Sequence, residues 1–183
     1  MTKRILALSL VAFSLIAATA YSVAQPPQPD AVAPASATRI LDLITARRVL
    51  MSAIGTKTDI FRGYVDESIP LDGERGRELA GDISTMLLAF PHLFPPETNP
   101  DTVGEEVQAD PATSTLANAA IWDDFDAFYS EAESVSDLAL QLQETETDDA
   151  FLAGATDLIA ACDSCHANWR QEEEPYEIPI PFQ

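Results

Sequence analysis

The sequence of 183 residues predicts an all-α protein folded as an antiparallel four-helix bundle. Apolar residues recur at spacings of three and four along four segments, which is the pattern of helices that each bury one face. No segment shows sustained apolar–polar alternation between hairpin turns, so a sheet is not expected. The connections between the four segments are short or of medium length, which favours antiparallel neighbours and therefore a bundle.

The first two helices are predicted at about residues 37–65 and 72–90. Ser36 or Thr38 is suited to cap the start of the first helix, because either hydroxyl can accept from a free backbone N–H. The second helix is expected to stop before Pro91, since a proline inside a helix removes a hydrogen bond and clashes with the preceding turn.

A long loop is predicted at residues 91–114, where five prolines interrupt any period. The third helix is expected at about 116–143. The fourth is expected at about 148–171, with Thr147 as its cap. These four segments form the predicted folded domain, residues 38–171.

The two ends of the chain are predicted to lie outside this domain. Lys3 and Arg4 precede an apolar run that closes on Ser22-Val23-Ala24, so residues 1–24 have the pattern of a signal peptide, with an uncleaved membrane anchor as the alternative. Residues 25–37 are a Pro/Ala-rich linker, and residues 172–183 form an acidic, proline-rich tail. Export through such a signal places the domain in the periplasm.

The chain is strongly acidic. Its formal charge is −20, and loss of Lys3 and Arg4 with the signal would take the charge to about −22. Such a charge excludes nucleic acid and anionic membrane surfaces as electrostatic partners. It favours a basic redox partner protein that docks through the acidic surface, while a plain solvated surface is the alternative.

The chemistry lies in Cys162-Asp163-Ser164-Cys165-His166. This C-x-x-C-H pattern is typical of c-type haem attachment, in which two thiols add to the porphyrin vinyl groups and the histidine ligates iron. Positions three and four apart share one side of a helix, so Cys162, Cys165 and His166 can address one ring together. The sequence therefore predicts one covalently bound haem c with His166 as axial iron ligand.

Three other uses of the motif are weaker. A structural zinc ion needs four ligands, and His92 alone does not complete the set. A redox C-x-x-C belongs in a thioredoxin-like βαβ setting, which the sequence lacks. A plain disulfide is permitted in an oxidising compartment, but it gives no role to the histidine that follows.

The position of the motif, near the end of a fourth helix and followed by Ala167-Asn168-Trp169-Arg170, resembles the class II c-type cytochromes, the cytochrome c′ family. Three further segments resemble this family and occur in the same order. Residues 47–55 resemble its first-helix pattern of an arginine, then a residue four positions later on the distal side of the haem, then a small residue. Residues 94–98 resemble the loop after the second helix, and residues 121–128 resemble the start of the third helix. The resemblance covers residues 38–171. The longer acidic loop before the third helix, the proline-rich tail and the strong negative charge depart from it.

The resemblance implies a bundle that encloses the haem, often a homodimer through the first two helices, with a sixth iron position that is vacant or filled by a first-helix methionine. It places Arg47 near a haem propionate, with a solvated surface arginine as the alternative. Met51 is a candidate sixth ligand, an apolar lid or an ordinary core residue. Arg170 is expected against the proximal imidazole or as a cation at the helix end.

Aromatic residues are the remaining candidates for haem contacts. Trp122 and Phe125 are predicted to touch the ring, while Phe128 and Trp169 are either haem walls or general core.

Two functions follow, and they differ at the distal face of the iron. A redox carrier would pass electrons through an exposed haem edge, with Met51 completing the iron. A gas-binding protein would hold nitric oxide or carbon monoxide at an open sixth site. A third possibility is an anchored or accessory haem subunit of a respiratory or photosynthetic complex. The sequence shows no catalytic dyad or triad, so an enzyme is not expected.

Overall fold

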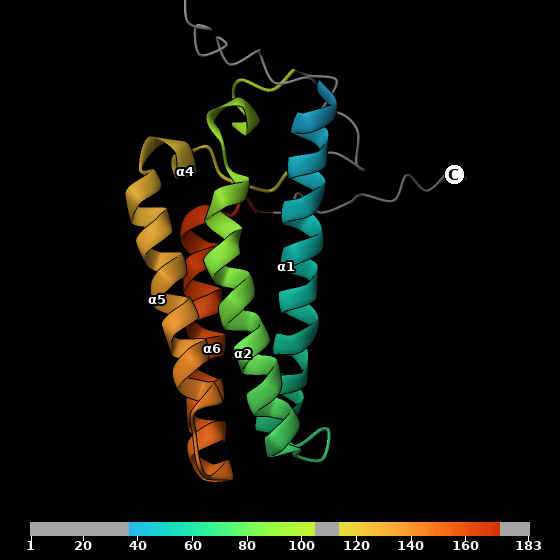
Figure 1. Ribbon diagram of the computed structural model, residues 1–183, viewed down its shortest axis with the longest axis vertical. Helices are drawn as coiled ribbons and strands as arrows, with labels where there is room; N and C mark the ends of the chain where they lie inside the picture. The colour runs from blue at the N-terminus through green and yellow to red at the C-terminus, as the bar shows by residue number, and fades with distance from the viewer. Residues whose placement is uncertain (1–36, 105–113, 173–183) are drawn as a thin grey trace, which may run out of the picture. The chain divides into compact units, whose positions relative to one another are not determined.

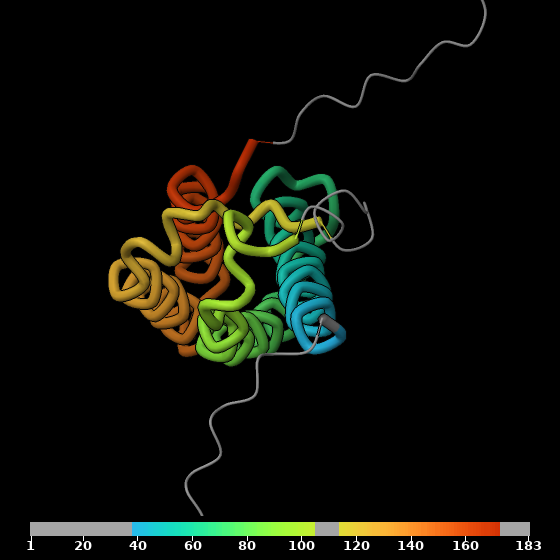
Figure 2. Tube along the Cα trace, turned by 90° about the horizontal axis from the view of Figure 1, so that it is seen from above, coloured from blue at the N-terminus to red at the C-terminus, as the bar shows by residue number. Residues whose placement is uncertain are grey.

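The computed structural model describes residues 37–104 and 114–172, and within them the predicted all-α class is confirmed (Figure 1). The bundle consists of α1 (Ala37–Val65), α2 (Gly73–Ala89), α5 (Phe125–Gln143) and α6 (Asp148–Trp169). Successive helices run in opposite directions, as predicted. Seen from above, α1, α2, α5 and α6 stand around a common centre, in that order (Figure 2).

Local hydrogen bonds explain where three of these helices begin. The side chain of Asp72 accepts from the N–H of Arg75 at the start of α2. Asp124 does the same for α5, and Thr147 for α6, which confirms Thr147 as a cap. Each cap satisfies one of the N–H groups that the first helical turn leaves without an intrahelical partner.

The third predicted helix is shorter than expected and is broken. A single turn, α4 (Ala120–Asp123), precedes α5, because Asp124 leaves helical geometry to cap α5. Residues 116–118 do not enter a helix either. They lie beside the chain that follows α6, where Asn118 N–H donates to Trp169 and Gln171 N–H donates to Leu116. The fourth helix therefore ends at Trp169, and Arg170 pairs with Ala117 in an isolated bridge.

The predicted long loop contains local structure as well. Two short 3₁₀ helices, η1 (Phe90–Leu93) and η2 (Pro96–Thr98), follow α2 directly. Both have proline in their first turn, where its fixed φ and missing N–H are tolerated. They bring Phe94, which is buried, over the end of the bundle.

The core forms two clusters. The larger contains Phe61, Leu79, Ile83, Leu142, Phe151 and Leu158 among its fully or almost fully buried members. The smaller, aromatic cluster contains Phe94, Ile121 and Phe128 at the opposite end of the helices.

The predicted signal peptide, nearly all of the linker and nearly all of the tail lie outside the described residues, so these remain predictions. Along residues 37–104 and 114–172, no helix is both long and apolar enough to cross a membrane.

Candidate haem site

The four bundle helices enclose two adjoining cavities. The first, of about 220 Å³, extends from Met51 to Thr58 and Arg62, and is here called the Thr58 cavity. The second, of about 640 Å³, extends from Met51 to Arg47 and Arg170, and is called the Arg47 cavity. Both are bordered by the same five residues: Met51, Phe90, Phe128, Cys165 and His166. Together they form one continuous space beside the C-x-x-C-H motif.

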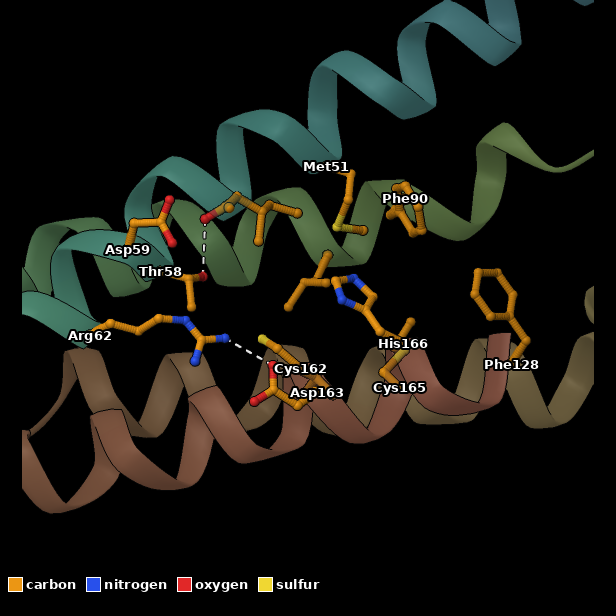
Figure 3. A pocket seen from close by; sticks show the side chains of 15 residues that line it. Met51, Thr58, Asp59, Arg62, Phe90, Phe128, Cys162, Asp163, Cys165 and His166 are labelled. Atoms are coloured by element: carbon orange, nitrogen blue, oxygen red, sulfur yellow. Dashed lines mark hydrogen bonds and ion pairs between the residues drawn. The ribbon is translucent and has the colours of Figure 1, made fainter. Parts of the chain in front are cut away.

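The three motif residues lie where the sequence predicts. Cys162, Cys165 and His166 are on α6, are half-buried, and border the cavities. Figure 3 shows His166 pointing from α6 into the space between α6 and α1. Both cysteines are free. The spacing on one helix therefore presents two thiols and an imidazole to the same space, as attachment of a single porphyrin requires.

Burial sets the chemistry of these groups. It raises the pKa of the Cys162 thiol to about 11. Burial, together with the nearby charge of Glu131, raises the pKa of the Cys165 thiol to about 12. Burial also lowers the pKa of His166, and Arg170 lowers it further. At neutral pH the thiols are protonated, which disfavours thiolate exchange chemistry, and His166 is neutral, the form that binds iron.

Met51 lies across the space from His166. It projects from α1, and its sulfur is directed toward the imidazole side of the cavity (Figure 3). Both residues border both cavities, so the space between them is where an iron held by His166 would lie. The structure thus brings together the two candidate axial groups, from helices that are far apart in sequence.

Arg47 provides an independent test of whether this site fits haem. Only 4% of its surface is exposed, and none of its three guanidinium nitrogens has a hydrogen-bond partner among the described residues. Burial lowers its pKa to about 10, so it remains charged at neutral pH. A buried charge without hydrogen bonds is costly unless a partner arrives. Because Arg47 borders the larger cavity, its guanidinium fits a haem propionate in charge and position.

Arg170 borders the same cavity and is exposed. It follows α6 directly, and its N–H still donates to the carbonyl of His166 at 3.0 Å. The structure therefore places Arg170 next to His166, where its charge affects the imidazole.

Residues 114–117 form a further wall of the cavity. The backbone hydrogen bonds described above hold them beside the chain that follows α6.

The aromatic candidates separate into two groups. Phe128 and Trp169 border the Arg47 cavity, and Phe128 borders the other cavity as well. Trp122 and Phe125 belong to the aromatic cluster but border neither cavity. The Trp122 indole N–H donates instead to the carbonyl of Pro95, and its ring lies 5.6 Å from the Arg47 guanidinium.

Other cavity residues were not anticipated from the sequence. Ile54, Gly55, Thr58 and Arg62 continue the stripe of Met51 along α1 at helical spacing, and this spacing is a signal that could have identified them. Phe94 and residues 114–117 come from irregular segments, for which periodicity gives no signal. Along the stretches that the structure describes, no group of three or more His, Cys, Asp or Glu side chains is arranged to hold a metal ion.

The family model and the most similar relatives found by comparison with known proteins indicate the same family. Residues 42–170 match the family model described as Cytochrome C′. A cytochrome c-554 from Cereibacter sphaeroides is 33% identical over 141 residues, which cover 75% of this chain and 98% of the relative. A cytochrome c-556 from Agrobacterium tumefaciens is 30% identical over 129 residues, which cover 69% of this chain and 95% of that protein.

Solved structures share the fold. A cytochrome c′ described as from Rhodobacter spheriodes superposes with a TM-score of 0.62 at 22% identity, covering 73% of this chain and 98% of that one. A nitric oxide complex of a cytochrome c′ variant from Alcaligenes xylosoxidans superposes with a TM-score of 0.58 at 18% identity, covering 73% and 97%. Because these sequence identities are low, the likeness shows a shared four-helix fold and nothing further.

Proposed function

The chain belongs to the cytochrome c′ family, and from this premise we propose that it is a one-electron carrier of the periplasm in which Met51 completes the iron coordination. Proteins of this family carry covalently bound haem c, whose iron supplies reversible one-electron chemistry. The residues of the chain that would hold this group are Cys162 and Cys165 as thioether attachments, His166 as an iron ligand, and Arg47 as the partner of a propionate.

One observation carries this proposal: Met51 and His166 face each other across the space that both cavities share (Figure 3). A thioether opposite an imidazole is an axial pair that favours electron transfer and raises the reduction potential of haem iron. If His166 and Met51 both held the iron, the protein would leave no open site for an added ligand.

Gas binding is the second candidate, because the wall around Met51 is apolar. Ile54, Leu87 and Phe90 border the same cavity as Met51, and their side chains offer no hydrogen bond to a polar ligand. The polar residues of this cavity on α1, Thr58, Asp59 and Arg62, come about two helical turns or more after Met51. Methionine is unbranched and flexible, so Met51 can act as a lid that moves aside. One solved relative of the fold is a nitric oxide complex, which makes nitric oxide and carbon monoxide the gases to test.

The ferrous absorption spectrum decides between these functions. It is to be recorded with and without carbon monoxide, in the native protein and in Met51→Ala. A low-spin native spectrum that becomes high-spin in the variant supports Met51 ligation and electron transfer. A high-spin native spectrum that changes with carbon monoxide overturns the carrier and favours gas binding. Met86→Ala is the control, because Met86 packs on the core from α2 and borders neither cavity.

The same proposal has two further parts. The protein is located in the periplasm, and it acts as an electron carrier without being an enzyme. Both parts are supported by the signal-like start of the sequence and by the attachment motif. The mass of the purified protein tests export, because cleavage of the signal would leave a chain that starts at Gln25. If the protein keeps its N-terminus and is found in the membrane fraction, an anchored or accessory subunit is favoured instead.

The partner of electron transfer is proposed to be a basic protein. Ala120–Trp169 contains twelve Asp and Glu residues and no Lys or Arg, whereas α1 carries five basic residues. The acidic charge is therefore concentrated on α5 and α6, the helices beside the haem attachment. Electron exchange with a small basic redox protein should slow as salt is added, because screening weakens steering. No salt dependence would contradict this partner.

A homodimer through α1 and α2 is proposed as well. Val49 on α1 and Leu88 on α2 are apolar but 63% and 50% exposed. The helices are antiparallel neighbours, so the two residues lie at similar distances from the connecting turn. Sedimentation should show a dimer that Val49→Glu with Leu88→Glu converts to a monomer. Leu140→Glu, at an exposed position on α5, should leave the dimer intact.

A further inference from the structure

Glu131 of α5 makes an unusual set of contacts for a carboxylate. Its Oε2 accepts from the Trp169 indole N–H at 2.6 Å, and both of its oxygens lie 3.3 Å from the Asn168 amide nitrogen. The side chain is half-buried. None of the salt bridges formed by the described residues includes it. Neutral donors therefore hold this carboxylate in place.

These contacts lie at the haem attachment. Trp169 follows His166 by three residues, and it borders the Arg47 cavity together with Cys165 and His166. Its ring packs edge-to-face on Phe128, with 5.7 Å between the centroids, and Phe128 borders both cavities. Trp169 thus fixes a negative charge at the edge of the cavity that Cys165 and His166 border.

We propose that Glu131 is a positioning residue that orients Trp169 at the proximal side of the haem and lowers the reduction potential of the iron. The inference rests on the proposed electron-transfer function. Oxidised iron carries one more positive charge than reduced iron, so a nearby anion favours the oxidised state. The effect is larger where water is partly excluded, as it is at the half-buried Glu131. Glu131 would then act against Met51, which raises the potential.

A potentiometric titration of the haem-loaded protein tests this inference. Glu131→Gln removes the charge but keeps a carbonyl oxygen that can accept from Trp169. Its midpoint potential should be more positive than that of the parent protein. This rise should be clearly larger than the rise in the control variant. The matched control is Glu133→Gln, which removes one exposed charge from the same helix. Equal shifts in the two variants would overturn the proposal.

Trp169→Phe separates the charge from the hydrogen bond. This variant keeps a ring against Phe128 and keeps the carboxylate, so its potential should stay nearer to the parent than that of Glu131→Gln. The opposite order would assign the effect to the indole and overturn the role of the charge. If Glu131→Gln fails to accumulate with haem, Glu131→Asp replaces it. The carboxylate then lies one methylene farther away, and a smaller rise, compared with Glu133→Asp, is expected.

The two proposals fail in distinguishable ways. If the parent protein shows no reversible one-electron wave, electron transfer itself fails. If the parent shows the wave and Glu131→Gln shifts it no more than Glu133→Gln, only the role of Glu131 fails. The visible spectrum of each variant confirms that the axial ligands are unchanged, so that a shift in potential reports the charge and not a lost ligand.

Discussion

The Arg47 guanidinium carbon lies 4.5 Å from the centroid of the Phe94 ring. Phe94 comes from the irregular chain after α2, and Arg47 comes from the middle of α1, so the contact ties η1 and η2 to the bundle. A cation over an aromatic face gains about 0.5–2 kcal/mol, which offsets part of the cost of burying the charge. The ring cannot satisfy the N–H donors, and these remain directed to the cavity where a propionate would lie.

Arg47→Met should therefore destabilise the haem-loaded protein. The variant keeps the length and apolar stem of the side chain but leaves a propionate without its charged partner, which costs about 3–5 kcal/mol when the pair is buried. Urea unfolding followed by haem absorbance and circular dichroism measures the loss. Arg75→Met is the control, because Arg75 makes an exposed ion pair with Glu78 at 2.9 Å. It should cost no more than about 1 kcal/mol. Equal losses in the two variants would contradict a propionate at Arg47.

Periodicity predicted the parts of this fold that depend on local pattern. The bounds of α1 agree with the structure, and Thr147 caps α6 as expected, because both follow from spacing and side-chain type. The break at Asp124 was missed. An aspartate can sit inside a helix or cap a new one, and the outcome depends on where residues 116–118 pair. That pairing, with residues 169–171, joins distant parts of the chain and leaves no periodic signal.

The site divides in the same way. The i, i+4 spacing placed Arg47 and Met51 on one face of α1, and the attachment motif placed Cys162, Cys165 and His166 on α6. The aromatic walls were harder to predict, because Trp122 and Phe125 have the same helical spacing as Phe128. Which of them reaches the cavity depends on the turn at Asp124, and only Phe128 does. Whether Trp122 or Phe125 touches the haem stays a prediction.

Ser84 and Ser136 form a buried polar link between α2 and α5. Their hydroxyl oxygens are 3.0 Å apart, and the Ser136 hydroxyl donates to the carbonyl of Ser84 at 2.9 Å. Ser136→Ala should lower the free energy of unfolding by about 1–3 kcal/mol, because the Ser84 hydroxyl loses its partner inside the core. Thermal or urea unfolding measures the change. Ser134→Ala, on the exposed side of the same helix, should change stability by less than about 0.5 kcal/mol. Similar losses would show that the link is not important.

Gly76 allows α2 to approach Phe151 of α6. A Cβ at this position would overlap the Phe151 ring, which is fully buried and cannot move aside easily. Gly76→Ala should destabilise the protein by about 1–3 kcal/mol, although alanine favours the helix. Gly154→Ala is the control, since its Cβ would meet only the flexible end of Leu142, at 3.0 Å. A stabilising Gly76→Ala in urea unfolding would show that the two helices are less closely packed than the structure indicates.

The start of α6 is expected to affect stability without affecting the haem. Thr147 caps this helix by accepting from the Ala150 N–H at 3.2 Å, and Cys162 lies roughly 20 Å farther along the helix at 1.5 Å per residue. Thr147→Ala should lower the free energy of unfolding by about 1 kcal/mol, because the first turn loses its acceptor. The visible spectrum and the midpoint potential should stay those of the parent.

Thr156→Ala provides the comparison for this cap. Thr156 lies in the middle of α6, is exposed, and donates only to the carbonyl of Leu152 in its own helix. Alanine has the higher helix propensity, so this variant should be neutral or more stable by a few tenths of a kcal/mol. A spectral change in Thr147→Ala, absent from Thr156→Ala, would mean that the two ends of α6 are coupled. The haem site would then depend on the whole helix, and not only on the packing around Cys162, Cys165 and His166.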